Sequence, residues 1–221
     1  MAVKFGILPR LTMINMDHEQ LLEKFTFFIT IAEWFGYVIH PVATIDEVTI
    51  FEEKFGVRLP DDYRWFVLNV ANGITNDKYQ TMVRHTDFVN YYYKENEFNP
   101  SLPFPFTQRV YFGSEEQDDA YENPGPTEHG KKLFNSKNLT NGQINLFDVF
   151  LVINGPEYGN IWIDNIASNR EIMPNDDTDA GLTRINFEYY INRKLDAAIQ
   201  AYQPRSRRYF PLERQKIRRT V

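Results

Sequence analysis

Apolar residues recur at helical spacing in the first part of the chain. Between Asp17 and Gly36 they fall on one helical face, and glycine is a residue that commonly ends a helix. The members of this face are Leu21, Phe25, Phe28, Ala32 and Phe35. Phe27, Ile31 and Trp34 lie off that face, so we expect this helix to be covered on two sides.

The stretch from Thr44 to Gly73 predicts two short helices joined by a tight turn. Thr44 and Glu47 have the spacing of a capping box, and Gly56 tolerates the left-handed conformation that ends many helices. Pro60 suits a first helical position, and two aspartates follow it where the helix dipole favours carboxylates. The predicted buried residues are Val48, Phe51 and Phe55 in the first helix and Tyr63, Phe66, Val67 and Val70 in the second, which we expect to end at Asn72 and Gly73.

Beyond this helix pair the pattern changes to short runs of β-branched and aromatic residues between turn signals. We predict strands at 79–83, 88–93, 109–112, 144–153, 161–164 and 170–173. Residues 100–106 hold three prolines, which favours an extended edge or a loop. Trp162 alternates with Ile161 and Ile163, which leaves a core role and an exposed contact both open. A closing amphipathic helix is predicted by Phe187, Ile191, Leu195, Ala198 and Tyr202.

These elements are typical of the α+β class. We expect a central antiparallel sheet packed on one face by helices from the N-terminal third and by a C-terminal helix. A single domain is predicted over residues 1–203, with a polar insertion at 113–142 and a basic tail at 204–221. The insertion has almost no periodic apolar pattern, and both a functional segment and a solvated one remain open for it.

Charge is distributed unevenly along the chain. The net charge of the whole sequence is −6, but residues 204–221 hold seven Lys and Arg against one Glu, which leaves −12 on the other 203 residues. The tail has three readings: a solvated end, a contact with nucleic acid or membrane, or a segment folded back on the acidic body.

The composition limits the cellular compartments and the reactive groups that we expect for this protein. There is no cysteine, which excludes disulfides, thiolate nucleophiles and cysteine-based zinc sites. The first 17 residues lack the uninterrupted apolar core of a signal peptide, and the longest apolar candidate, 25–39, is too short to span a bilayer. We therefore expect a soluble, cytoplasmic protein with no membrane partner.

Candidate reactive groups are few. His85 and Asp87 share one face if they lie on a strand, but a zinc site needs three or four ligands and no further spacing supports one. The sequence holds no G-x-S-x-G and no glycine-rich phosphate loop. Tyr91, Tyr92 and Tyr93 could stack on nucleobases, but the acidic body would repel phosphates. We expect no catalytic residue, metal, cofactor, small-molecule substrate or direct nucleic-acid binding.

Several short motifs occur together in a recognisable order. They are Phe51-Glu52, Phe55-Gly56, Leu59-Pro60, Asp62-Tyr63-Arg64, Phe66 and Asn72-Gly73, then the runs 150–155 and 158–164 with Gly159, Trp162 and Asp164, and lastly Asn186-Phe187-Glu188. This set, from about Thr44 to Tyr202, resembles the SMI1/KNR4 family, also called the SUKH superfamily. Ile74 departs from the family pattern, in which a second glycine commonly follows Asn72-Gly73.

The resemblance implies a protein that binds other proteins. The family includes many bacterial immunity proteins, which occupy cognate toxins, often nucleases, and fungal scaffolds that regulate cell-wall synthesis. An acidic body suits a toxin with a cationic cleft. Our hypothesis is a non-catalytic immunity protein, monomeric or weakly dimeric, whose contact residues are Glu115, Glu116, Asp118, Asp119, Tyr121 and Glu122. The alternative is a regulatory scaffold that uses the apolar face of 44–73 and the basic tail.

Overall fold

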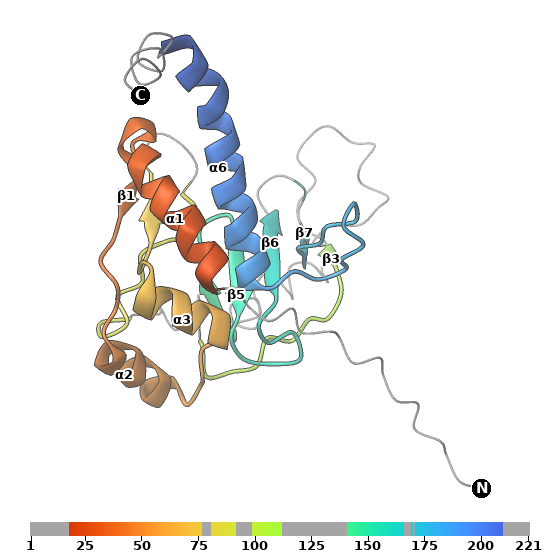
Figure 1. Ribbon diagram of the computed structural model, residues 1–221. Helices are drawn as coiled ribbons and strands as arrows, with labels where there is room; N and C mark the ends of the chain where they lie inside the picture. The colour runs from red at the N-terminus through yellow and green to blue at the C-terminus, as the bar shows by residue number, and fades with distance from the viewer. Residues whose placement is uncertain are drawn as a thin grey trace, which may run out of the picture.

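A computed structural model describes residues 18–76, 81–91, 99–111, 141–165, 169 and 171–209 of the chain. Four α-helices and seven strands occur in these ranges (Figure 1). The helical elements are α1 (His18–Ala32), its 3-10 continuation η1 (Glu33–Phe35), α2 (Ile45–Phe55), α3 (Asp61–Asn69) and α6 (Phe187–Tyr209). The strands are β1 (Val38–Ile39), β2 (Ile74–Thr75), β3 (Val110–Tyr111), β4 (Gln143–Asn145), β5 (Val149–Val152), β6 (Ile161–Asn165) and β7 (Glu171–Pro174).

The strands form two antiparallel sheets. β1 pairs with β2 in a small sheet, and the larger sheet has the order β3-β7-β6-β5-β4. The register is fixed by hairpin pairing, with Trp162 opposite Phe150 on one side and opposite Pro174 on the other. β3 and β4 are consecutive in the chain but occupy opposite edges of the large sheet, so the stretch between them connects one edge to the other.

The large sheet has a core on each face. Ile161, Val149 and Leu151 face the helices in the main core, which also takes in α1, α2, α3 and α6. The alternate residues Phe150 and Trp162 face the other way, into a smaller core. That second core also holds Val152, Ile172 and Phe104, with Phe106 and Val110 packed against it. All four residues of β5 are buried, because both of its faces are covered.

α1 and α6 lie side by side over the helical face of the sheet and run in the same general direction (Figure 1). Near the middle of each helix, Lys24 Nζ contacts Asp196 Oδ2 at 2.9 Å. Further along, the Tyr202 ring lies 6.5 Å from the Phe27 ring and 6.3 Å from the Phe35 ring. α6 then continues past these contacts to Tyr209, beyond residue 203, at which we expected the domain to end.

The α+β class, the antiparallel sheet and the helices at both ends are confirmed. The helices pack on one face of the sheet, as expected, but the other face is covered too, because residues 104–106 pack on it. The core role of Trp162, whose side chain is fully buried in the second core, is confirmed.

Three predicted boundaries are also wrong. The strand expected at 144–153 is a hairpin, in which Phe147 has a φ of 138° and Asn145 Oδ1 accepts a hydrogen bond from the Phe147 N–H. Residues 88–90 form bends and residue 91 belongs to no strand, since the Asp87 carboxylate accepts a hydrogen bond from the Asn90 N–H at 2.9 Å. α3 ends at Asn69, three residues before the expected stop.

The prediction for the second side of α1 is only partly right. Ile31 is buried, but Phe27 and Trp34 remain 44% and 55% exposed. No helix in the described ranges is long and apolar enough to cross a bilayer. Of the insertion at 113–142, only 141 and 142 fall within the described residues.

Candidate protein-binding surface

The turn between α2 and α3 is built by local capping interactions. Thr44 Oγ1 accepts a hydrogen bond from the Glu47 N–H, and the Glu47 carboxylate accepts one from the Thr44 N–H at 2.7 Å, which confirms the capping box. At the other end of α2, Gly56 has a φ of 62°, a left-handed C-cap as predicted. Pro60 is the N-cap of α3 and not its first helical residue, so the helix begins one residue later than expected, at Asp61. The chain is thereby directed from α2 into α3 at a fixed angle.

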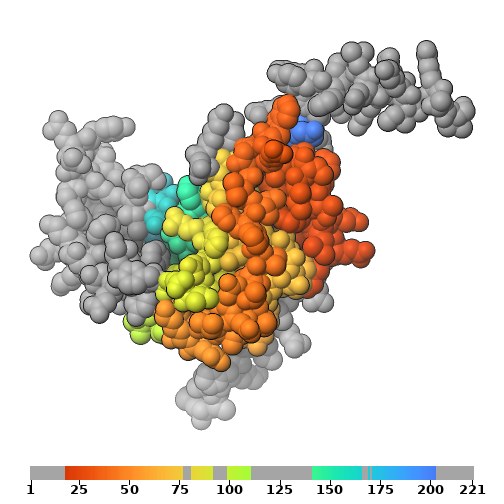
Figure 2. All heavy atoms as spheres, turned by 90° about the vertical axis from the view of Figure 1, so that its left-hand side faces the viewer, coloured from red at the N-terminus to blue at the C-terminus, as the bar shows by residue number. Residues whose placement is uncertain are grey.

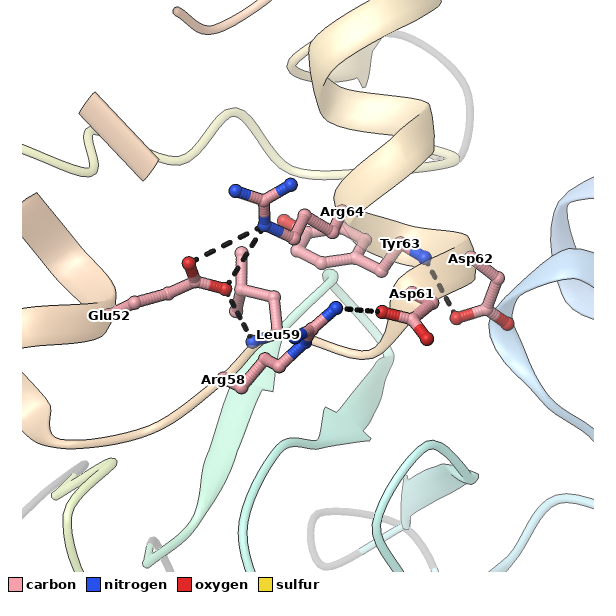
Figure 3. Close-up of polar contacts among 7 residues, drawn as sticks. All are labelled: Glu52, Arg58, Leu59, Asp61, Asp62, Tyr63 and Arg64. Atoms are coloured by element: carbon pink, nitrogen blue, oxygen red, sulfur yellow. Dashed lines mark hydrogen bonds and ion pairs between the residues drawn. The ribbon is translucent and has the colours of Figure 1, made fainter. Parts of the chain in front are cut away.

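Glu52 holds this turn from the inside (Figure 3). Its Oε1 accepts a hydrogen bond from the Leu59 N–H at 2.9 Å. Arg64 Nε lies 3.3 Å from Oε1 and 3.4 Å from Oε2 of the same carboxylate. The Glu52 side chain is only 16% exposed, so its charge is screened less by solvent than that of a surface residue. One carboxylate therefore fixes both the turn and the guanidinium of α3.

Asp62 joins the starts of two helices. Its Oδ1 accepts a hydrogen bond from the Tyr63 N–H at 2.8 Å, and its Oδ2 accepts one from the Glu188 N–H at 3.1 Å. Burial raises the pKa of the Asp62 carboxyl, and these backbone donors oppose that effect. Because both carboxylate oxygens face backbone N–H groups, Asp62 serves to dock α6 against α3.

The outer surface of the turn presents charged and aromatic groups. Arg58 Nη2 contacts Asp61 Oδ1 at 2.9 Å, with both side chains largely exposed. Tyr158, in the β5–β6 turn, is 45% exposed. Burial raises the pKa of the Tyr158 hydroxyl, and the negative charge of the Asp61 carboxylate raises it further, so Tyr158 lies within electrostatic range of the start of α3. We call Arg58, Asp61 and Tyr158 the junction surface.

The next motif, Asn72-Gly73, serves close backbone packing. Gly73 has a φ of 125°, and a Cβ atom built on it would lie 2.7 Å from the His85 Cα. Asn72 Nδ2 donates to the Thr86 carbonyl at 2.8 Å, and the buried Tyr63 hydroxyl lies 3.3 Å from Thr86 Oγ1. Burial raises the Tyr63 pKa strongly. These residues hold segment 82–86 against α3.

The remaining motif residues lie in the core, in a turn or on a strand. Phe51, Leu59 and Phe66 are fully buried in the main core. Gly159 has a φ of 85° in the β5–β6 turn, as a left-handed position requires, and Asp164 lies exposed on β6. Beside Gly159, Glu157 is buried and forms an ion pair with Arg184 Nε at 2.7 Å.

The histidine predicted as a metal candidate has a different neighbour. The His85 ring lies 4.6 Å from the His40 ring, edge to face, and His40 Nε2 is 2.8 Å from Thr75 Oγ1. Asp87 instead bonds to Asn90. Among the described residues, no group of three or more His, Asp or Glu side chains is placed to hold a metal ion.

The structure brings the motif residues of α2, α3 and their turn together, places Gly159, Trp162 and Asp164 elsewhere on the β5–β6 hairpin, and does not describe the predicted contact residues. Glu115, Glu116, Asp118, Asp119, Tyr121 and Glu122 lie outside the described residues. Sequence reasoning missed the junction surface, because Tyr158 and Asp61 are nearly a hundred positions apart in the chain. The predicted apolar face of 44–73 is buried in the main core, so it is not a surface that a partner can reach.

Comparison with known proteins gives one match, to a protein family. The family model described as SMI1 / KNR4 family (SUKH-1) matches residues 42–211. No curated protein matches the chain, and no solved structure does. The matched span begins after α1 and contains α2, α3, the large sheet and α6.

Proposed function

Because this chain belongs to the SMI1 / KNR4 family, we propose that it is a non-catalytic protein-binding module, and specifically an immunity protein that neutralises a cognate toxin by direct binding. The family match over residues 42–211 is the observation that carries the proposal. Two polar motif residues support a non-catalytic role, since the carboxylates of Glu52 and Asp62 accept hydrogen bonds from backbone N–H groups and thereby stabilise the fold.

Charge supports a cationic partner. The chain without its last 18 residues carries −12, and exposed acids occur on several elements of the described surface. They include Glu19, Glu23, Glu33, Asp46, Glu53, Asp176 and Asp179. Such a field attracts a protein with a basic cleft, as nucleases that bind phosphates have, and increases the association rate at low salt.

We propose the contact residues in two groups. The first is the acidic set of the insertion, Glu115 to Glu122, with Tyr121 as an aromatic anchor. The second is the junction surface, in which Tyr158 offers a half-exposed ring beside Arg58 and Asp61. Aromatic anchors dominate many interfaces, while peripheral charges mainly set the association rate.

Where a toxin-like protein is encoded beside this chain, the decisive experiment measures binding to it and protection against it. The variant E115Q/E116Q/D118N/D119N/E122Q should bind more slowly and protect cells less, and wild-type binding should weaken steeply with salt. The matched control E19Q/D46N/E53Q/D176N/D179N removes the same number of charges elsewhere. Unchanged binding of the first variant would exclude the insertion, and loss with the control alone would place the contact on the described surface.

The alternative is a regulatory scaffold protein of the same family. The face of 44–73 that we expected it to use is buried, so a scaffold would need another surface. Genomic neighbourhood separates the two proposals, because an adjacent toxin gene favours immunity and an isolated gene favours regulation.

A further inference from the structure

The exposed side of α1 and η1 combines aromatic rings with acids. Glu23, Phe27, Thr30 and Trp34 follow one another at spacings of four, three and four residues, which places them on one face of the helix. Phe27 and Trp34 are 44% and 55% exposed. Figure 2 shows α1, in red, at the surface of the molecule. We call Glu19, Glu23, Phe27, Glu33 and Trp34 the α1 ridge.

The ridge has a negative charge of its own. Glu19, Glu23 and Glu33 are exposed, and the one cation of α1, Lys24, is already paired with Asp196. An apolar strip flanked by carboxylates favours an occupant that carries cations and a few apolar side chains.

α6 leads the chain to this ridge. Its Tyr202 ring contacts Phe27 and Phe35, and the helix continues to Tyr209, a rise of about 10 Å past that contact. α6 therefore ends beyond the level of this contact, and the sequence that follows it is FPLERQKIRRTV, residues 210–221. They carry Arg214, Lys216, Arg218 and Arg219 with a single acid, Glu213, and they include the apolar Leu212 and Ile217.

The length of this segment suits the ridge. Twelve residues in extended conformation span up to about 40 Å. Returning to the level of Trp34 takes about 10 Å of that length, whereas α1 with η1 is about 27 Å long. The end of the chain can thus run the whole length of the ridge from Trp34 towards Glu19.

We propose that residues 210–221 fold back along the α1 ridge, with their cations against Glu19, Glu23 and Glu33 and their apolar residues on Phe27 and Trp34. This contact does not rest on the proposed function. α1 lies before the span matched by the family model, and residues 212–221 lie after it, so the contact would join segments on either side of the matched span.

The strength of the contact depends on salt. Each exposed ion pair contributes little by itself, but attachment to α6 keeps the segment at a local concentration on the order of millimolar. The Debye length falls from about 8 Å at physiological salt to about 3 Å at 1 M. The segment should therefore leave the ridge at high salt.

Spin labels on the full chain test this directly, since the absence of cysteine allows a single labelling site. In Q215C the nitroxide should broaden the indole N–H signal of Trp34, and in V221C it should broaden that of Trp65, which stacks on His18 at the start of α1. Trp162, in the core on the far face of the sheet, should keep its signal in both proteins. Intensities are compared with the same samples after reduction of the label.

Variants and mixing experiments decide between occupants. Broadening should be lost at 1 M salt and reduced in E23Q/E33Q, whereas the charge-matched control D46N/E53Q on α2 should retain it. Equal intensities before and after reduction at low salt would overturn the proposal and leave the ridge to a separate partner. Broadening of an unlabelled, isotope-enriched chain mixed with labelled chain would also overturn it, since the occupant would then be a second copy.

Discussion

At the scale of single residues, the Glu52 carboxylate connects two elements that the chain must hold at a fixed angle. It accepts the Leu59 N–H and lies within 3.4 Å of Arg64 Nε, while its side chain is mostly shielded from water. Removing such an acceptor leaves a shielded donor without a partner, which costs more than an exposed ion pair contributes.

We expect Glu52→Ala to lower the free energy of unfolding by about 1–3 kcal/mol, because the Leu59 N–H and Arg64 lose their acceptor. Glu52→Gln should cost less, since its amide oxygen can still accept from Leu59. The neighbouring Glu53→Ala, at an exposed position, should change stability by no more than about 0.5 kcal/mol. Urea denaturation measures all three; equal losses in the alanine variants would contradict the assigned role.

Substitutions at Gly73 and Gly159 distinguish two costs of adding a Cβ atom: the strain of a positive φ and a clash with neighbouring backbone. Both have a positive φ, but a Cβ on Gly73 would meet the His85 backbone at 2.7 Å, whereas one on Gly159 meets nothing within 4 Å. We expect Gly159→Ala to cost about 1–2 kcal/mol for the left-handed conformation alone. Gly73→Ala should cost clearly more, because a backbone segment must also move. Similar melting temperatures for the two variants would refute this.

His40 should make stability depend on pH. Burial, and then the nearby His85, lower the pKa of His40, so the folded state favours its neutral ring. The unfolded chain then binds more protons, and the stability contribution is present above about pH 6.5 and is lost as the pH falls through the folded-state pKa. Asp62 acts oppositely, because its pKa is raised and its ionisation costs stability as the pH rises.

We therefore expect His40→Gln to flatten the decline of unfolding free energy between pH 7 and pH 5.5. Comparison with wild type cancels the Asp62 contribution, which both proteins share. His18→Gln is the control, since His18 stacks on Trp65 in another part of the molecule. Identical slopes in the wild-type and His40→Gln proteins would argue against the effect.

At the scale of elements, the N-terminus of α2 depends on its capping box. Thr44→Ala removes the acceptor for the Glu47 N–H and should destabilise the protein by about 1 kcal/mol. Thr49→Ala, within the same helix, should be neutral or slightly stabilising because alanine has the higher helix propensity. Thermal unfolding of both variants tests the cap, and a Thr49→Ala loss as large as that of Thr44→Ala would refute it.

The helices and the sheet could be predicted because their signals are local. Thr44, Glu47 and Gly56 mark the ends of α2 by spacing alone, and Ile161 to Asp164 show the alternation of a strand. The hairpin of β4 and β5 could not be predicted from the sequence. Its turn at Leu146–Asp148 interrupts an apolar run without a glycine, and it places Phe147 at a positive φ. Long-range contacts such as Asp62 with the Glu188 N–H have no local signal either.

At the scale of the whole molecule, the two cores share their strands. Adjacent residues of β5 and β6 point into opposite cores. Unfolding of one core therefore displaces strands that also form the other core. We expect a single cooperative unfolding transition. In W34F/W65F, fluorescence reports Trp162 in the second core, and its urea midpoint should coincide with that of far-UV circular dichroism. A fluorescence midpoint at lower urea would show that the second core unfolds first.

The edge positions of β3 and β4 affect how far the sequence of the segment between them can vary. The segment between them starts at one border of the sheet and ends at the other, roughly 19 Å away across four strand spacings. No ladder pairing of the five strands depends on what that segment contains. The length and sequence of the segment can therefore vary, provided that it still bridges that span, while the five-stranded sheet stays the same. Different proteins with this sheet could in this way present different segments to different partners.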